Sequence, residues 1–252
     1  MTRRIAVRVA EAAASLVVFL VAWKVLTVVT GTPEYILPPP EIVGERALTA
    51  IDSGLLWEHV AATLQEVVLG LALGAATAVA VGVALGKSLL VERVLSPYIV
   101  AAQAVPVLAL APLLDLWFGG GLLARVLVCA LIVFFPIAIA TMVGVRSADP
   151  LLREMLRSLG ATPGQVTRWL EIPSALPVIF GGLRVGVTLS VIGAVVAEWV
   201  SASVGLGVLI NIADQGLFDT PLMFVALAAL AVIGLGLYGL VVLVERRLLA
   251  TA

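Results

Sequence analysis

The stretch LLARVLVCALIVFFPIAIATMV, residues 122–143, decides the fold class of this chain. A helix needs about 20 mostly apolar residues to cross the hydrocarbon core of a bilayer, and this stretch has that length. Its apolar residues are continuous and lack the alternation with polar residues that marks a strand of a membrane barrel. The stretch therefore predicts a membrane-spanning helix.

The composition of the whole chain agrees with this prediction. Of its 252 residues 62% are hydrophobic and 12% are charged, whereas a soluble domain has about 25% charged residues. This balance excludes an ordinary soluble enzyme and a disordered regulator. With a net charge of −1, the chain lacks the overall positive charge that is typical of nucleic-acid-binding proteins. Cys129 is the single cysteine and cannot form an internal disulfide.

Working outward from residues 122–143, we predict an all-α membrane protein with six spans in one transmembrane domain, residues 1–252. The spans lie near residues 12–29, 67–85, 94–114, 122–143, 176–197 and 222–244. The first block has the basic front of a signal peptide, but its apolar run is too long, so we expect a retained span. Spacings such as Gly82/Gly86 and Gly182/Gly186 predict close helix packing within the chain.

Cationic residues predict the orientation. With the N-terminus inside, most cations fall on the cytoplasmic side, as the positive-inside rule requires. The cytoplasmic set is Arg3, Arg4, Arg8, Lys87, Arg93, Arg146, Arg153, Arg157, Arg168, Arg246 and Arg247, against Arg46 and Arg125 outside. We therefore expect both termini in the cytoplasm.

The segment between the fourth and fifth spans, residues 149–175, predicts two short amphipathic helices. Asp149 is a suitable N-cap with Pro150 at the first helical position, and Gly160 is suited to end that helix. Thr162 and Pro163 begin the second helix. Anchoring at the membrane surface would explain both helices without any further role.

This segment resembles the EAA loop of ABC-importer permeases, the binding-protein-dependent inner-membrane components. The matching residues are Glu154, Gly160, Ala161, Ile172, Pro173 and Pro177, although Met155 and Leu156 replace two alanines of the family pattern. Further matches are Leu37–Pro40, Phe135–Pro136 with Thr141 and Gly144, and Gly205–Gly207. The resemblance covers nearly the whole chain and is greatest for the nitrate, sulfonate and taurine branch. The run Gly193–Glu198 looks more like the riboflavin and thiamine-precursor permeases.

The resemblance implies a six-span permease of the type I importer kind in a bacterial inner membrane. Two copies would form the solute pathway, and the loop 149–175 would dock on a cytoplasmic ATPase dimer that uses ATP and Mg²⁺. An extracytoplasmic binding protein would deliver the solute. The implied coupling residues are Arg153, Glu154, Arg157, Leu159, Gly160, Ala161, Ile172 and Pro173. Candidate substrates are riboflavin, a thiamine pyrimidine precursor, a sulfonate, taurine or nitrate.

Polar residues inside apolar spans are costly, so each is a candidate for the solute pathway. We single out Gln103, Thr188, Ser190, Glu198 and Asn211; Gln65, Thr141 and Arg184 share the property. Glu198 is expected either to be solvated at the membrane surface or to act at a gate. His59 is expected to be exposed, and Lys24 is expected to reach toward an interface.

The chain offers no catalytic or metal-binding constellation at the level of sequence. The run Gly82–Ser88 resembles a phosphate-binding P-loop, but its glycine spacing is short by one residue and no strand precedes it. We therefore expect a transport subunit without its own ATPase site and with no cofactor bound. The alternative is an ion-coupled secondary transporter, which predicts ionisable residues buried at mid-membrane and a discontinuous helix pair. The sequence offers few such residues and no internal repeat, so we rank this alternative below the importer.

Overall fold

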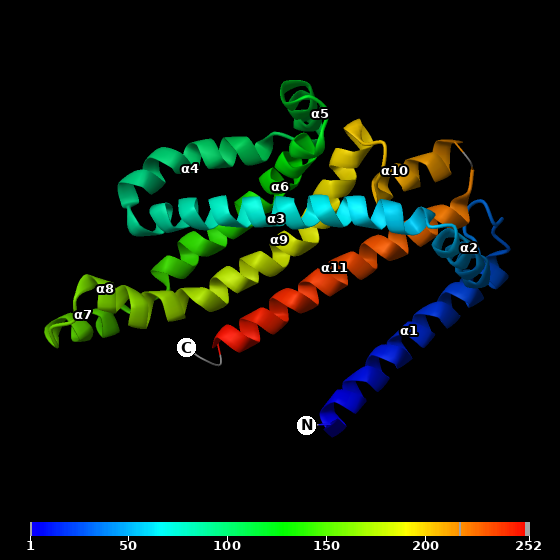
Figure 1. The fold of residues 1–252 in the computed structure, drawn as a ribbon. Helices are drawn as coiled ribbons and strands as arrows, with labels where there is room; N and C mark the ends of the chain where they lie inside the picture. The colour runs from blue at the N-terminus through cyan, green and yellow to red at the C-terminus, as the bar shows by residue number, and fades with distance from the viewer. Residues whose placement is uncertain (1, 217, 250–252) are drawn as a thin grey trace. The chain divides into compact units, whose positions relative to one another are not determined.

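The computed structural model of the chain describes residues 2–216 and 218–249, with side chains from residue 10 onward except residues 12 and 216. The side chains of Arg3, Arg4 and Arg8 therefore lie outside the described residues. Within this part all regular secondary structure is helical (Figure 1). The helices are α1 (Thr2–Thr30), α2 (Pro40–Asp52), α3 (Leu55–Lys87), α4 (Leu89–Ala104), α5 (Val107–Phe118), α6 (Leu122–Arg146), α7 (Pro150–Ser158), α8 (Pro163–Val166), η1 (Thr167–Glu171), α9 (Ile172–Ser201), α10 (Leu206–Asn211), η2 (Ile212–Gly216) and α11 (Thr220–Leu249), where η1 and η2 are π-helical.

Five of the six predicted spans are confirmed as long apolar helices, and the third is a bent pair of helices. Among the described residues, 5 helices are long and apolar enough to cross a membrane, or up to 6 if one bent pair counts as a span. The bent pair is α4 and α5, which meet at 95°. Residues 94–114 are therefore two helices and not one straight span. Pro106 has no N–H and forces Val105 into an extended conformation (φ −78°, ψ 122°), which ends α4 there.

The chain divides into two compact units, residues 1–58 with 209–228, and residues 59–208 with 229–252. In the first unit, α1 is tied to the start of α11 by the stacked rings of Trp23 and Phe224, whose centroids lie 5.4 Å apart. Lys24 pairs with Glu41 of α2, and this hydrogen bond lowers the pKa of the Glu41 carboxyl. Arg46 donates to Asp219 at 2.7 Å.

The second unit is built around α6, which packs along α9 over most of its length. Its buried core includes Val133 and Ile137 of α6 with Ala78 of α3. A Cβ added at Gly82 of α3 would lie 2.6 Å from both the Ala138 carbonyl oxygen and Thr141 Cβ. One added at Gly186 of α9 would lie 2.7 Å from Ile137. The predicted close packing of small residues within the chain is thus confirmed.

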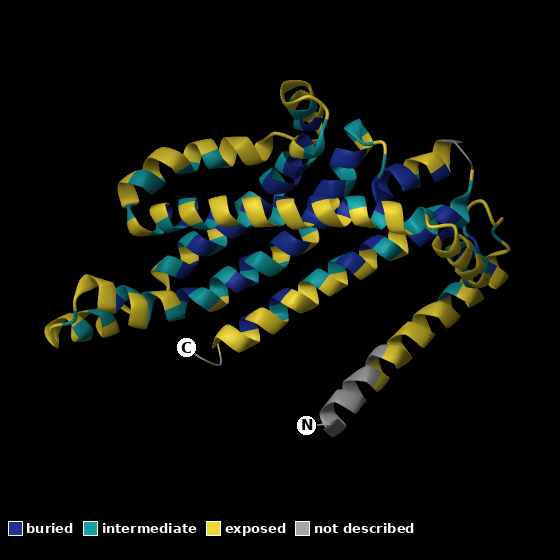
Figure 2. Cartoon of the chain, viewed as in Figure 1, coloured by how far each residue is buried: buried dark blue, intermediate teal, exposed yellow. Residues whose placement is uncertain are grey.

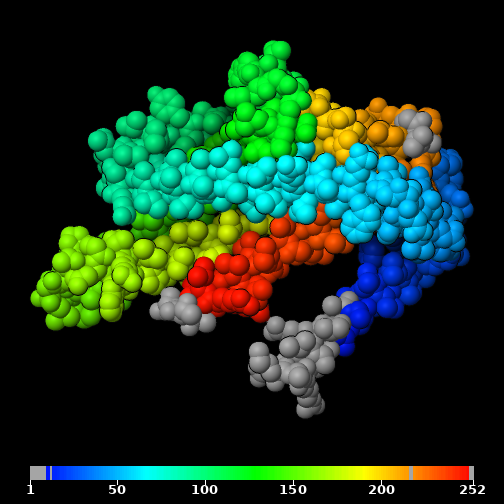
Figure 3. All heavy atoms as spheres, viewed as in Figure 1, coloured from blue at the N-terminus to red at the C-terminus, as the bar shows by residue number. Residues whose placement is uncertain are grey.

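Exposed residues run along the long helices of each unit (Figure 2), and many of them are large and apolar. In the second unit, Val68 and Leu69 of α3, Val100 of α4 and Leu235 of α11 are examples, and Leu235 is 72% exposed. Apolar surface of this extent suits contact with lipid and not with water. At one end of this unit α7 and α8 form a projecting lobe, best seen in the space-filling view (Figure 3).

Candidate functional site

Helix α7 forms the tip of the lobe, and its local sequence fixes both of its ends. The Asp149 carboxylate accepts a hydrogen bond from the Leu151 N–H at 2.8 Å, and Pro150 occupies the first turn, as predicted. Gly160 follows the helix with φ +82°, a conformation that side chains rarely adopt. The turn lets the Ala161 N–H donate to the Leu156 carbonyl at 3.0 Å. The chain thereby reverses over a very short distance.

Helix α8 begins with a complete capping box. The Thr162 N–H donates to the Gln165 side chain at 2.8 Å, and the Thr162 hydroxyl accepts from the Gln165 N–H. From Pro163 the helix continues through η1 into α9, so that residues 163–201 form one unbroken helical rod. Pro173 lies in the first turn of α9, where its missing N–H costs little. The second helix of the lobe is therefore continuous with a spanning helix.

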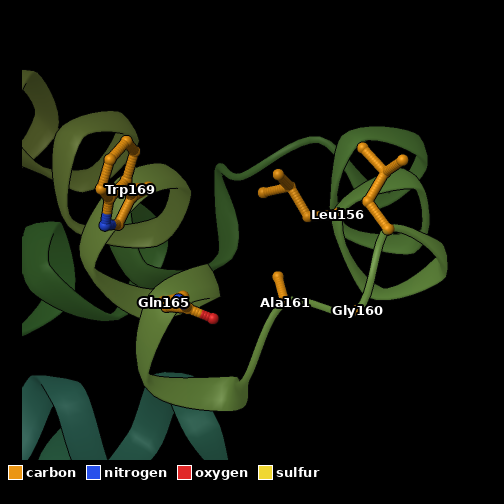
Figure 4. A pocket seen from close by; sticks show the side chains of 6 residues that line it. Leu156, Gly160, Ala161, Gln165 and Trp169 are labelled. Atoms are coloured by element: carbon orange, nitrogen blue, oxygen red, sulfur yellow. The ribbon is translucent and has the colours of Figure 1, made fainter.

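The lobe presents apolar side chains that nothing in the chain covers. Leu151, Leu159 and Trp169 are 75%, 77% and 76% exposed. A hollow of about 300 Å³ lies between the two helices, with Leu156 and Leu159 on the α7 side and Gln165 and Trp169 on the α8 and η1 side (Figure 4). We name these exposed residues and the hollow the lobe surface. Exposed apolar area around a hollow, framed by polar side chains, is typical of a protein interaction site.

The predicted coupling residues divide into two groups. Glu154, Arg157, Leu159 and Gly160 are exposed on α7 and its turn, and Ile172 is half-exposed. Arg153 instead points inward, with its guanidinium 3.3 Å from a Glu171 carboxylate oxygen. Glu171 also accepts from the Thr167 hydroxyl at 2.8 Å. Arg153 thus braces α7 against η1, a role that the sequence did not distinguish from docking.

Glu198 lies near the far end of α9 and is 1% exposed. It accepts hydrogen bonds from the Thr63 hydroxyl and the Gly207 N–H, both at 2.5 Å. The expected solvation of Glu198 at the membrane surface is therefore wrong for this conformation. The carboxylate is a buried ligand for the first N–H groups of α10, where a negative charge is stabilised.

Gly205 and Gly207 are glycines because Glu198 occupies the space beside them. A Cβ at Gly205 would lie 2.3 Å from the Glu198 carboxyl carbon, and one at Gly207 would lie 2.8 Å from a carboxylate oxygen. His59 meets the same loop, since its Nδ1 lies 3.0 Å from the Gly205 nitrogen, and it is only 6% exposed. The prediction that His59 is exposed is therefore wrong. We call His59, Thr63, Glu198 and residues 205–207 the Glu198 cluster.

A second buried acid, Glu66, was missed at the level of sequence. It is fully buried and accepts from Arg125 Nε of α6 at 2.5 Å. Arg125 was predicted in an external loop, but it lies in the first turn of α6 and is 18% exposed. The sequence signal that could have identified Glu66 is the spacing of His59, Thr63 and Glu66, which places all three on one face of α3.

The predicted pathway residues are not all accessible. Ser190 is buried, and its hydroxyl donates to the Val187 carbonyl at 2.7 Å. Gln103 in the last turn of α4 and Thr188 on α9 are exposed. Asn211 is also exposed but belongs to the first unit. Arg184, one helical turn from Thr188, pairs with Glu245 of α11 beside a cavity of about 630 Å³.

Comparison with known proteins identifies the class. Residues 70–250 match the family of binding-protein-dependent transport system inner membrane components. The chain is 50% identical to the riboflavin transport system permease protein RibX of Chloroflexus aurantiacus, over 93% of this chain and 87% of the relative. It is 36% identical to the formylaminopyrimidine transport permease protein ThiX of Halalkalibacterium halodurans, over 86% and 85%. It is 34% identical to the taurine transport system permease protein TauC of Escherichia coli, over 92% and 86%.

Solved structures support the fold. The chain in the crystal structure of an amino acid ABC transporter with histidines superimposes with a TM-score of 0.63 at 23% identity, over 79% of this chain and 97% of that one. A chain of the inward-facing MetNI methionine ABC transporter gives a TM-score of 0.63 at 21% identity, over 78% and 97%.

The chain belongs to the family of binding-protein-dependent inner-membrane transport components. It is the permease subunit of an ABC importer and a multi-pass protein of the inner membrane. The resemblance drawn from the sequence is thereby confirmed, and the relatives give no support to the ion-coupled secondary transporter.

Proposed function

We propose that two copies of this chain form the pathway of an ATP-driven importer, and that each copy docks on one subunit of a cytoplasmic ATPase dimer through the lobe surface. In this proposal ATP and Mg²⁺ are bound by the ATPase, and an extracytoplasmic binding protein delivers the solute. Both termini and the lobe then face the cytoplasm. The observation that carries the proposal is the uncovered apolar surface at the tip of the lobe.

The connection of the lobe to the spans supports a mechanical role. Helices α8 and α9 are continuous, and the ion pair between Arg153 and Glu171 ties α7 to the start of this rod. A push on α7 therefore tilts α9 instead of bending a loose loop. Two alternative tilts of the same rod would give the inward-open and outward-open states that import requires.

We propose riboflavin, or a similar uncharged heteroaromatic molecule, as the solute. Support comes from the 50% identity to a riboflavin transport permease. Gln65, Gln103 and Thr188 are exposed polar side chains on the spans, and all three are uncharged hydrogen-bonding groups. Arg184 is neutralised by Glu245, so it offers no free charge to a sulfonate such as taurine.

The docking proposal is tested with the complete importer in proteoliposomes. The variant Leu159→Ser/Trp169→Ser changes two side chains that are more than three-quarters exposed, so the fold of the permease is expected to persist. We expect the ATPase to be lost from the purified complex and ATP-dependent uptake to fall about tenfold or more, because buried aromatic anchors dominate interface energies. Arg93→Glu, a charge reversal on α4, is the control.

A second variant changes one charged residue and one turn glycine of the lobe. Glu154→Arg/Gly160→Pro should leave the cooperative thermal unfolding of the spans unchanged, but it should disrupt the turn after α7, because proline cannot adopt φ +82°. We expect ATP hydrolysis to be uncoupled from uptake. Coupling that stays intact in both variants would refute docking at this surface. The substrate is tested separately, by competition of unlabelled riboflavin, taurine and a formylaminopyrimidine for uptake. Uptake of taurine that riboflavin does not inhibit would refute the proposed solute and leave the docking proposal standing.

A further inference from the structure

A polar cavity of about 410 Å³ lies where α3 and α6 end and α7 and α8 begin. It is distinct from the hollow of the lobe surface and shares none of its lining residues. Four cationic side chains line it, with a single carboxylate among them: Lys87, Arg146, Arg153, Arg157 and Glu171. Its volume is within the range of about 300–1,000 Å³ that is usual for small-molecule sites.

The charges around this cavity are not balanced within the chain. Arg146 is paired with Glu92 at 2.7 Å, and Arg153 with Glu171 at 3.3 Å. The side chains of Lys87 and Arg157 have no hydrogen-bond or ion-pair partner among the described residues. Two cations therefore remain for a ligand.

One donor of the cavity is also unsatisfied. The Nε of Arg153 is buried and has no hydrogen-bond partner. A buried donor without an acceptor costs free energy, so a small shift of the Arg153 guanidinium toward an anion in the cavity would relieve this cost. A phosphate group matches this donor set, because guanidinium and ammonium groups form short, charge-assisted hydrogen bonds to its oxygens.

The depth of the cavity indicates where a phosphate could come from. Lys87 is the last residue of α3 and Arg146 the last residue of α6, and both helices are apolar enough to span a membrane. The cavity thus lies at the level of lipid headgroups. Basic pockets between helix ends at this level are suited to anionic phospholipids.

We propose that this cavity binds a phosphate group, carried by an anionic phospholipid or present as free phosphate. The phosphate would lie between Lys87 at the end of α3 and Arg157 on α7, and would hold the lobe at a fixed angle to the spans. The cavity shares no lining residue with the lobe surface, although Arg153 and Arg157 are also predicted coupling residues. The proposal does not depend on the solute.

The test uses the full-length chain in neutral detergent, with binding measured by native mass spectrometry. Phosphatidylglycerol is titrated against phosphatidylcholine, and inorganic phosphate is titrated separately against chloride at equal ionic strength. The variant Lys87→Gln/Arg157→Gln removes two charges that make no hydrogen bond, so folding is not at stake. The control Arg93→Gln/Arg168→Gln removes two arginines that do not line the cavity.

We expect phosphatidylglycerol to bind in preference to phosphatidylcholine, and the Lys87→Gln/Arg157→Gln variant to bind it about tenfold more weakly. The control should bind as the unmodified chain does. Saturable binding of inorganic phosphate, lost in the same variant and without lipid preference, would support the site with free phosphate as its source. Equal binding by the unmodified chain and the variant in both titrations would overturn the proposal.

The final experiment repeats the lipid-binding measurement on the complete importer with its ATPase. A carbodiimide cross-link from Lys87 to a carboxylate of the ATPase, together with loss of lipid binding, would show that an acidic protein side chain fills the cavity and would also overturn the proposal. Retention of phosphatidylglycerol in the complex is the supporting result. Neither readout requires transport, so failure of the docking proposal would be seen independently.

Discussion

The Glu198 cluster predicts a large loss of stability when its carboxylate is removed. In Glu198→Ala the Thr63 hydroxyl and the Gly207 N–H, each now 2.5 Å from a carboxylate oxygen, lose their acceptor in a buried place. Each buried donor without a partner costs about 1–3 kcal/mol, so the sum is about 2–6 kcal/mol. This is a large part of the roughly 5–15 kcal/mol that stabilises a domain.

Thermal unfolding of the purified chain in detergent measures the global effect, and hydrogen exchange of the Gly207 amide measures the local one. We expect a clearly lower unfolding temperature and faster exchange at the start of α10. Glu198→Gln keeps one acceptor oxygen. Its unfolding temperature and its Gly207 exchange rate should therefore lie between those of the unmodified chain and those of Glu198→Ala. Glu154→Ala, which removes an exposed carboxylate, is the matched control and should change stability by less than about 0.5 kcal/mol.

A Glu198→Ala chain as stable as the control, with the Gly207 amide still protected, would refute the reasoning. That result would mean that water or a neighbouring carbonyl replaces the carboxylate at no cost. Glu198 would then be free for a role in gating, which was the other expectation from the sequence.

Two further predictions concern glycines. Gly82→Ala places a Cβ 2.6 Å from the Ala138 carbonyl oxygen, and overpacking of this kind should destabilise the chain by about 1–3 kcal/mol in thermal unfolding. Gly236→Ala, whose Cβ meets nothing within 4 Å, should be neutral or stabilising; similar values for the two would contradict the close packing of α3 on α6. Gly160→Ala forces a side chain into φ +82° and should cost about 1–2 kcal/mol, seen as faster proteolysis of the lobe. Gly164 has no positive φ, and a Cβ added there would meet nothing within 4 Å. The lobe of Gly164→Ala should therefore resist proteolysis as well as the lobe of the unmodified chain. Equal proteolysis of Gly160→Ala and Gly164→Ala would be evidence against the strained turn.

Much of the local structure could be predicted from the sequence. The caps of α7 and α8 are confirmed at Asp149, Gly160 and Thr162, because capping depends on residues a few positions apart. The long apolar helices are confirmed for the same reason, since length and apolar composition are properties of a single segment. The prolines Pro106 and Pro112 signalled a disturbed third span, but its angle of 95° could not be predicted from them.

The buried polar residues show what the sequence could not give. Whether Glu198 is solvated or buried depends on residues 205–207 and on Thr63, which lies 135 positions away in the chain. His59 was expected to be exposed because it lies in the outer lead-in to the second span, and it is buried because a loop from another part of the chain covers it. The pairing of Glu66 with Arg125 likewise joins two helices that no local pattern connects.

The sequence by itself determined most of the apolar spans, the caps of the lobe and the family. Each span, cap and family motif depends on residues that are near one another in the chain. Only the tertiary structure decided which polar groups are buried, which cations are already paired and which remain open to a ligand. These properties depend on the desolvation of each group by distant segments and on the partners that those segments bring.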